Sequence, residues 1–436
     1  MSRYNAIRNW GKTFTFIPEN IEKPKSTEAV VSIVNTANRY NQKIRPIGSR
    51  YSYTPLVSCE ETTLSLQHFT GVEEINSNEL TALVRAGTKL EQLEKVLFSK
   101  GFSLYNMGDI NQQTLAGLIS TGSHGTGLSF ATASNQITWL ELVTPDGTIL
   151  ECSESQNKEL FKAAQVSLGV LGVITRMKIR ILPKYCLRQE RTLVDFNEAL
   201  NQLHHSFCTN RNYEFFWFPY TNFVFEKKGN ITDLPSTTNL LKKNFNDYFL
   251  ENGMLWLLCE GSRYLPNLYR KNANWFLQKM NTNLNQTMES IHYYATPRYV
   301  NHREIEYALP LTQAIAALGE IKKMLNEHQG HVSFPIEVRC AAADDIYLSP
   351  GFDCESVWIA VHAYTRDEYQ DFFRKAEQIF LHFGGRPHWG KLHWLSHNQL
   401  KERYPCWDKF MAIRKELDPK GIFLNKYLQE LFEGNN

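Results

Sequence analysis

The segment FPIEVRC, residues 334 to 340, places two opposite charges in an otherwise apolar stretch. Glu337 and Arg339 lie two positions apart, so a β-strand would direct both side chains to the same face. The fixed fork of donors on a guanidinium can bind a substrate oxygen and stabilise an alkoxide, while a neighbouring carboxylate can orient a hydroxyl group and accept its proton. We therefore expect Glu337 and Arg339 to be catalytic; the alternative is a structural buried ion pair.

Three basic side chains in the last fifth of the chain could move a proton. His362 lies in IAVHAYT, which alternates as a strand does, and His388 and Lys391 lie in GGRPHWGKLH, whose glycines allow a tight loop beside Trp389. An imidazole or a desolvated amine can take a proton from a hydroxyl group. The residues alone leave two alternatives open: His362 as a satisfied structural histidine, and Lys391 as a solvated loop lysine.

No metal site is expected. His388, His393 and His397 are spaced by five and four residues, but the sequence between them is poor helix material and offers no acidic ligand. The eight cysteines form no CxxC pair and show no spacing typical of metal binding.

The stretch NMGDINQQTLAGLISTGSHGTG, residues 106 to 127, has the composition of an anion-binding loop. Its glycines would let backbone N–H groups converge on one point, and its serine and threonine hydroxyl groups add donors. It matches neither the GxGxxG pattern nor the GxxxxGK[ST] phosphate loop. Alone it could be a glycine-rich turn. Further glycine turns at Gly48 and at 169 to 172, with Arg50 beside the first, favour a bound dinucleotide and its pyrophosphate.

Periodicity predicts the elements that position these loops. Residues 27 to 42 predict a helix after a Ser/Thr cap, and a short buried strand follows at IRPIG. A strand and a capped helix ending at Gly101 come next, then QITWLELVTPDGTIL predicts a hairpin with Pro-Asp-Gly at its turn. After another helix, a strand should end at Pro183. The first 180 residues are therefore expected to be α+β.

The rest of the chain predicts a second group of strands. YEFFWFPYTNFVFEK, HVSFPIEVRCAAADD and VWIAVHAYT are strand-like, and a polar, asparagine-rich stretch near 229 to 290 predicts helices. Residues 384 to 436 predict a loop, a helix and a terminal amphipathic segment.

Composition limits the class of protein. The chain has 436 residues, of which 42% are hydrophobic, so we expect a globular protein of about two or three domains. A net charge of +2 without a long basic run argues against nucleic acid as a partner. The longest apolar run, MLWLLC at 254 to 259, gives no strong membrane signal. The cysteine pattern predicts reduced thiols and a cytoplasmic location.

Five motifs in order resemble one family of flavoproteins. IRPIGSRYSYTPL, TLAGLISTGSHGTG, SLGVLGVIT, FPIEVRCAAADD and GGRPHWGKLH are similar to segments of the vanillyl-alcohol-oxidase type FAD-linked oxidases. The resemblance is nearest to the sugar-1,4-lactone oxidases, the group that acts on D-arabinono- and L-gulono-1,4-lactone, with the alditol oxidases close by. It spans about residues 14 to 430 and is more specific for the family than for the sugar.

The resemblance implies an α+β fold with two domains. An FAD-binding domain of two subdomains (PCMH type) is expected over residues 1–183, and a substrate cap domain with a large antiparallel sheet over 184–383. Residues 384–436 are expected to return to the FAD-binding domain.

The resemblance also implies which residues contact FAD. They come from the glycine loops, the turn before the strand ending at Pro183, and the loop at GGRPHWGKLH. The expected set is Pro46, Ile47, Gly48, Ser49, Arg50, Tyr51, Ser52, Gly108, Asp109, Gly117, Ser120, Thr121, Gly122, His124, Gly125, Thr126, Gly127, Gly172, Ile174 and Lys391.

Tyr51 departs from the family pattern. Many relatives carry at this position a histidine bonded covalently to the flavin C8-methyl group. We therefore predict FAD held without a covalent bond, with the ring of Tyr51 packed beside the dimethylbenzene edge; a tyrosine ether is the alternative.

Two further roles are implied by family position. Gly108 stands where relatives carry a small residue near flavin C4a, and glycine leaves room for dioxygen; the alternative is a simple turn glycine. Lys391 near the flavin pyrimidine would stabilise the anionic reduced ring, and we expect it to be the main catalytic residue. His362 and His388 are expected to contact the substrate.

These observations predict an FAD-dependent oxidase that removes hydride from C2 of an aldono-1,4-lactone similar to D-arabinono-1,4-lactone, with dioxygen reduced to hydrogen peroxide. Three alternatives remain open. An alditol oxidase would act on the terminal hydroxyl of a polyol, and a lactone dehydrogenase would pass electrons to another acceptor. A non-catalytic flavoprotein or nucleotide-binding module is the third, and Glu337, Arg339 and Lys391 argue against it.

Overall fold

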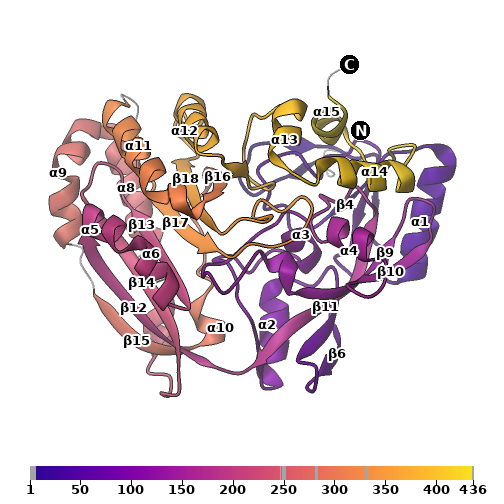
Figure 1. Cartoon of the computed structure of the whole chain (residues 1–436), viewed down its shortest axis with the longest axis horizontal. Coiled ribbons are helices and arrows are strands. Elements are labelled where there is room, and N and C mark those ends of the chain that lie inside the picture. Colours follow the sequence, from indigo (N-terminus) through magenta and orange to yellow (C-terminus); the bar gives the residue numbers. More distant parts are fainter. Residues whose placement is uncertain (1–5, 246, 248–251, 280–282, 329–331, 435–436) are drawn as a thin grey trace.

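The computed structural model describes residues 6–245, 247, 252–279, 283–328 and 332–434. Figure 1 shows the N-terminal elements, coloured indigo to purple, together with the yellow C-terminal helices on one side of the molecule. The magenta to orange elements of the middle of the chain form the other side.

The chain begins with two small sheets. Strands β1 (Ile7–Arg8) and β2 (Thr15–Phe16) pair with each other, and three parallel strands follow in the order β3 (Asn20–Glu22), β5 (Thr62–Ser65), β4 (Ile44–Ile47). Helix α1 (Thr27–Tyr40) connects β3 to β4. The hydroxyl of Ser26 accepts a hydrogen bond from the N–H of Ala29, which caps the helix as its sequence predicts.

A six-stranded antiparallel sheet follows, in the order β10-β9-β11-β7-β6, with β8 paired to the far end of β11. The hairpin predicted around Pro-Asp-Gly is confirmed as β9 and β10, and β11 ends at Pro183 as predicted. The bounds are β6 Val72–Asn76, β7 Thr81–Arg85, β8 Phe102–Leu104, β9 Ile137–Val143, β10 Ile149–Ser153, β11 Val173–Pro183, α2 Leu90–Ser99, α3 Leu115–Ile119, the 3-10 helix Ala133–Gln136 and α4 Lys158–Ala164.

The middle of the chain forms an eight-stranded sheet in the order β15-β12-β14-β13-β17-β18-β16-β19, and every neighbouring pair is antiparallel. Helices pack against it at several strands, including α5 on β12 and β14 and α12 on β16. The bounds are β12 Cys186–Asp195, β13 Asn212–Trp217, β14 Phe223–Thr232, β15 Leu284–Glu289, β16 His302–Pro310, β17 Ile336–Ala341, β18 Ser356–Tyr364, β19 Arg386–Pro387, α5 Phe196–Asn201, α6 Leu203–Thr209, α10 Ser290–Tyr293, the 3-10 helix Leu311–Gln313, α11 Ala314–Glu327 and α12 Gln370–His382.

The central strands of this sheet are buried on both faces. Every residue of β17 and of β18 is buried, although the polar residues alternate along both strands. The polar positions therefore face a covered interior and not bulk solvent, because the N-terminal part of the chain lies over that face of the sheet.

The asparagine-rich stretch is helical only in its centre. Helices α7 (Leu240–Phe245), α8 (Asn252–Tyr264) and α9 (Pro266–Lys279) occupy it, but β14 extends to Thr232 and β15 begins at Leu284. The prediction of helices from 229 to 290 was thus wrong at both ends, where pairing with β12 decides the structure. Residues 246, 248–251 and 280–282 of this stretch lie outside the described residues.

The C-terminal segment contains three helices, not the single helix predicted. These are α13 (His397–Arg403), α14 (Trp407–Leu417) and α15 (Lys426–Glu433), and Pro405 and Pro419 fall in the breaks between them. The segment contacts the N-terminal strands: the N–H of Ile44 donates to the carbonyl oxygen of Ile422 at 2.9 Å. In the described part of the chain, no helix is long and apolar enough to cross a membrane.

Candidate active site

A cavity of about 830 Å³ lies where the N-terminal loops face the eight-stranded sheet. Its walls come from the turn after β4, the glycine-rich loop around α3, one face of β16, β17 and β18, and the loop after β19. A volume of this size falls in the range of sites for cofactors and small molecules.

Most of the residues selected from the sequence line this cavity. They are Pro46, Ile47, Gly48, Ser49, Arg50, Tyr51, Ser52, Gly108, Asp109, Gly117, Ser120, Thr121, His124, Gly172, Ile174, Glu337, Arg339, His362, His388 and Lys391.

Gly122, Gly125, Thr126 and Gly127 lie outside the lining, and their contact with a cofactor stays a prediction. Thr126 and Gly127 join the glycine-rich loop to the sheet. The N–H of Gly127 donates to the carbonyl oxygen of Cys340 at 2.9 Å, and a Cβ on Gly125 would come within 2.6 Å of the carbonyl oxygen of Met107. Close approach of backbones explains these glycines.

Strand register places the charged side chains on one face of the sheet. Arg339 on β17 lies beside Glu214 on β13, and Glu337 lies two residues from Arg339 on the same face. On the next strands, Glu304 on β16 is directly opposite His362 on β18. The predicted strand that directs Glu337 and Arg339 to one face is confirmed.

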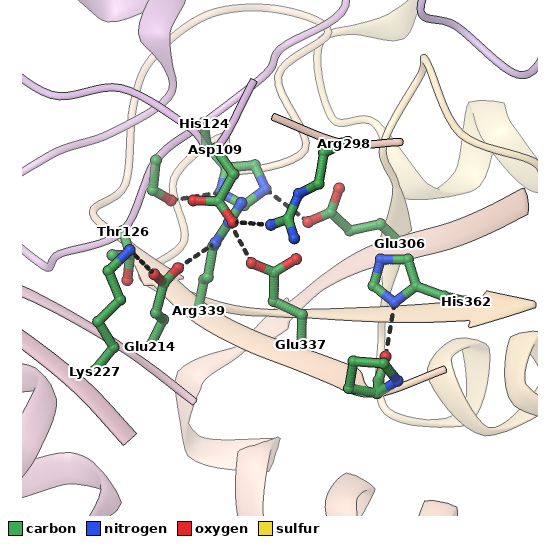
Figure 2. A network of polar contacts seen from close by, with 12 residues as sticks. Asp109, His124, Thr126, Glu214, Lys227, Arg298, Glu306, Glu337, Arg339 and His362 are labelled. Atoms are coloured by element: carbon green, nitrogen blue, oxygen red, sulfur yellow. Dashed lines mark hydrogen bonds and ion pairs between the residues drawn. The ribbon is translucent and has the colours of Figure 1, made fainter. Parts of the chain in front are cut away.

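Arg339 is the centre of the first polar network, shown in Figure 2. Its Nε donates to Oε2 of Glu214 at 2.8 Å, its Nη2 lies 2.7 Å from Oδ2 of Asp109, and Nη2 also contacts Oε1 of Glu337. Arg298 also pairs with Asp109 at 2.7 Å. Asp109, which the sequence predicted to contact the cofactor, therefore holds Arg298 and Arg339 in place.

Two of the carboxyl groups around Arg339, those of Glu337 and Asp109, do not share the same charge state. Burial and the nearby Asp109 and Glu214 raise the pKa of Glu337 well above its ordinary value, although Arg339 opposes this. For Asp109 burial also favours the neutral form, but Arg339, Lys227 and Arg298 outweigh it and lower the pKa. Glu337 is thus the member of the network that carries a proton.

Lys391 and Glu304 form the core of a second network. Nζ of Lys391 lies 2.5 Å from Oε2 of Glu304 and 3.9 Å from Oε2 of Glu306. Burial alone would raise the pKa of Glu304, but Lys391 and His362 outweigh it and hold this pKa well below its usual range. Nζ of Lys391 therefore faces two carboxyl groups of β16.

The two histidines selected from the sequence present different ring atoms. Nδ1 of His362 lies 2.8 Å from the carbonyl oxygen of Pro335, which can only accept, so Nδ1 carries the hydrogen. Nδ1 of His388 instead accepts the N–H of Gly390 at 2.9 Å, so its hydrogen is on Nε2. Burial lowers the pKa of each ring to about 4. Nε2 of His362 therefore offers a lone pair to the cavity, whereas Nε2 of His388 is a donor.

Both ring nitrogens of His124 lie close to oxygen atoms. Nε2 of His124 lies 2.9 Å from Oε1 of Glu306, and its Nδ1 lies 2.8 Å from the carbonyl oxygen of Gly125. Burial favours a neutral Glu306, but the neighbouring His124 outweighs it and lowers the pKa of this carboxyl to about 2. His124 thus connects the glycine-rich loop to β16.

Comparison with known proteins identifies the family. The model of the family described as D-arabinono-1,4-lactone oxidase matches residues 177–431, and the model described as FAD binding domain matches residues 18–153. The chain belongs to the D-arabinono-1,4-lactone oxidase family. The resemblance inferred from the five motifs is thereby confirmed.

Relatives match this lactone oxidase family member along its whole length. L-gulono-1,4-lactone dehydrogenase of Mycobacterium tuberculosis is 32% identical, with 97% of this chain and 98% of the relative covered. L-gulonolactone oxidase of Mus musculus is 31% identical, with 98% of each covered. Among solved structures, cholesterol oxidase from B. sterolicum matches with a TM-score of 0.77 at 17% identity, covering 98% of this chain and 96% of the other. That likeness concerns the fold alone. Together with the match to the FAD binding domain and the observed eight-stranded sheet, it confirms the predicted fold of an FAD-binding domain and a cap domain with a large antiparallel sheet.

The lining of the cavity in this lactone oxidase family member fits FAD. A Cβ on Gly48 would collide with Oγ1 of Thr114, and one on Gly117 would lie 2.9 Å from the same atom. The two glycine loops thus meet around Thr114 with bare backbone, which suits the close approach of a pyrophosphate. Serine and threonine hydroxyl groups and Arg50 stand beside them in the lining.

Tyr51, the residue predicted to pack beside the cofactor, lies in the wall of the cavity. Its half-buried ring lies in the cavity lining and stacks on Trp10, with centroids 5.7 Å apart. Burial raises the pKa of the Tyr51 phenol, so the hydroxyl stays neutral.

Sequence reasoning missed several residues of this site. Three of them, His302, Glu304 and Glu306, alternate along HREIEYALP, so their period of two could have identified a polar strand face. Glu214, Arg298 and Tyr53 gave no comparable signal. The histidines tested for metal spacing do not converge: His393 contacts the hydroxyl of Tyr427, and His397 bonds to the carbonyl oxygen of Leu431.

Proposed function

We propose that the protein is an FAD-dependent oxidase that acts on the C2 hydroxyl of an aldono-1,4-lactone similar to D-arabinono-1,4-lactone, with dioxygen as electron acceptor. The observation that carries the proposal is the arrangement at the sheet face. The imidazole of His362, whose Nε2 carries a free lone pair, lies in the same cavity as the basic side chains of Lys391 and Arg339. FAD, when bound, supplies the hydride acceptor.

His362 is the residue best placed to take the hydroxyl proton. Its Nε2 bears the lone pair, and Oε1 of Glu304 lies 3.7 Å away, where a carboxylate stabilises the imidazolium that forms. The proton passes from the substrate hydroxyl to Nε2 as the C–H bond gives up its hydride. His388 cannot replace it at Nε2, because that atom already carries hydrogen.

The cations orient the substrate and offset negative charge. Nζ of Lys391 is paired with the carboxylate of Glu304, so we assign it charge stabilisation at the cofactor's pyrimidine side, and not proton removal. Arg339 is fixed by Asp109 and Glu214 and can donate to a substrate oxygen. Glu337, which carries a proton, is assigned a donor role in place of the acceptor role predicted from the sequence.

We further propose that FAD is held without a covalent bond. The stacking of Tyr51 on Trp10 and its neutral hydroxyl support this. Acid precipitation of the purified protein should release yellow colour into the supernatant; colour that remains in the pellet would contradict it. The eight free thiols support the proposal of a cytoplasmic location, which cell fractionation would test.

Dehydrogenase activity is the second candidate. The relative named a dehydrogenase is 32% identical to this chain, and a relative named an oxidase is 31% identical. Sequence identity therefore does not decide between the two activities. Gly108, which favours an oxidase by family position, also has a packing reason: a Cβ there would lie 2.9 Å from the carbonyl oxygen of His124. Turnover in air compared with anaerobic turnover on a dye decides between the two.

The substrate class is tested by direct comparison. Peroxide formation from D-arabinono-1,4-lactone in air supports the proposal. Faster turnover of xylitol than of the lactone would instead favour an alditol oxidase that uses the same residues.

A further inference from the structure

Two histidines and one carboxylate converge at the end of the cavity. The side chains are His302 and Glu304 on β16 and His362 on β18, all three buried. One nitrogen from each ring and one carboxylate oxygen lie within 4.8 Å of one another. This set of donors is the one that binds zinc in several enzymes, where two histidines and a glutamate leave the fourth position open.

Hydrogen bonds fix the rings in the orientation that a metal requires. Nδ1 of His302 bonds to the carbonyl oxygen of Val300 at 3.1 Å, and Nδ1 of His362 to that of Pro335 at 2.8 Å. Both Nδ1 atoms therefore carry hydrogen, and both Nε2 atoms point toward Glu304, at 3.8 and 3.7 Å from its oxygens. Metal-binding histidines are held in this way, with the second ring nitrogen donating to a backbone carbonyl.

The ligand atoms lie somewhat farther apart than in a metal site. Zinc bonds of about 2.0 to 2.2 Å in a tetrahedral arrangement separate the ligand atoms by roughly 3.4 Å. Nε2 of His302 lies 3.8 Å from Oε2 of Glu304, Nε2 of His362 lies 3.7 Å from Oε1, and one atom from each of the three residues falls within 4.8 Å of the others, so binding needs an inward movement of the side chains. We propose that His302, Glu304 and His362 form a binding site for a divalent cation of the Zn²⁺ class.

Lys391 competes with such a cation for Glu304. Its ammonium lies 2.5 Å from Oε2 of Glu304, but Oε2 of Glu306, 3.9 Å away, gives it a second partner. A bound cation displaces Lys391 toward Glu306 and covers Nε2 of His362. Binding at this site therefore closes the cavity end to substrate.

The other carboxylate-rich cluster does not offer such a site. Asp109, Glu214 and Glu337 also bring one oxygen each within 4.8 Å, but Arg339 pairs with all three. The positively charged guanidinium of Arg339 therefore lies where a metal ion would have to bind.

Calorimetric titration of the FAD-loaded protein with Zn²⁺ alone, without sugar, tests the site. The titration is made in a Cys208→Ser background, because Cys208 is exposed and its Sγ lies 3.7 Å from Nδ1 of His204, which could bind zinc at the surface. We expect one Zn²⁺ per chain. His302→Gln should weaken binding by about 100-fold or more, and Lys391→Met should tighten it by removing the competing charge.

His393→Gln provides the matched control, because this histidine is also buried but lies outside the cluster; its affinity for Zn²⁺ should equal that of the background protein. Absence of a one-to-one complex in the background protein would overturn the proposal. So would unchanged affinity in a folded His302→Gln variant. If that variant does not fold, Glu304→Gln carries the same expectation. Heat of binding is independent of turnover, so failure here leaves the proposed oxidase function standing.

Discussion

Nζ of Lys391 lies 2.5 Å from Oε2 of Glu304, and this ion pair separates the roles of the basic residues in the cavity. Lys391 comes from the loop after β19 and Glu304 from β16, so the pair fixes the loop against the sheet. In the proposed mechanism Lys391 offsets negative charge and His362 takes the proton; Nε2 of His362 lies 3.7 Å from Oε1 of the same carboxylate.

Lys391→Met should slow flavin reduction by about 10²- to 10³-fold, because a positive charge near the reduced cofactor is lost. Lys391→Arg keeps the charge and should lose less. Anaerobic stopped-flow absorbance measures the reduction step directly. Unchanged reduction in a variant that still holds FAD would rule out the assigned role.

His362→Gln should lower the reduction rate by about 10²- to 10⁴-fold through loss of the proton acceptor. His388→Gln is the matched control, because this ring is equally buried and presents a donor at Nε2. The account requires the larger loss at His362. A larger loss at His388 would mean that the assignment of ring hydrogens is wrong.

Asp109→Asn should destabilise the fold by about 3 to 5 kcal/mol, because it leaves the buried Arg339 and the partly exposed Arg298 with one anionic partner fewer. Asp408→Asn is the control: Asp408 forms an exposed ion pair with Lys401, whose loss should change the free energy of unfolding by about 0 to 1 kcal/mol. Chemical denaturation measures both. Equal, small effects would show that Asp109 does not hold Arg298 and Arg339.

The buried carboxyl of Glu94, which lies outside the candidate active site, should make the stability of the fold depend on pH. Burial raises the pKa of this carboxyl to about 8, and Nδ2 of Asn111 donates to it at 3.3 Å. A raised folded-state pKa means that the contribution of Glu94 is full below the unfolded value of about 4.5 and is lost as the pH rises through about 8. Glu94→Gln should therefore raise the melting temperature at pH 9 by several degrees and change it little at pH 5. The exposed Glu79→Gln should have no effect at either pH; a matching gain there would refute the interpretation.

The sequence predicted local geometry better than it predicted partners. The spacing of Glu337 and Arg339 was enough to place both on one strand face, and the glycine loops were enough to indicate a dinucleotide site. The partners of Arg339 could not be derived, because Glu214 lies 125 residues away and meets it only through the pairing of β13 with β17. The tight backbone packing at Gly125 and Gly127 could not be derived either, because a glycine that serves backbone packing looks the same in sequence as one that serves a ligand.

The fold was also predictable only in part, because local sequence does not show which distant segments pair. Capping and periodicity located α1, the β9–β10 hairpin and the end of β11. The order of the eight-stranded sheet depends on contacts between distant segments, and only the family resemblance indicated a large antiparallel sheet.

The most direct test of the account is anaerobic mixing of the FAD-loaded protein with D-arabinono-1,4-lactone, followed by admission of air. The account predicts that the flavin absorbance bleaches on mixing and returns in air with one hydrogen peroxide formed per flavin. A flavin that stays oxidised with the lactone, or that bleaches but is not reoxidised by dioxygen, would contradict the proposed lactone oxidase.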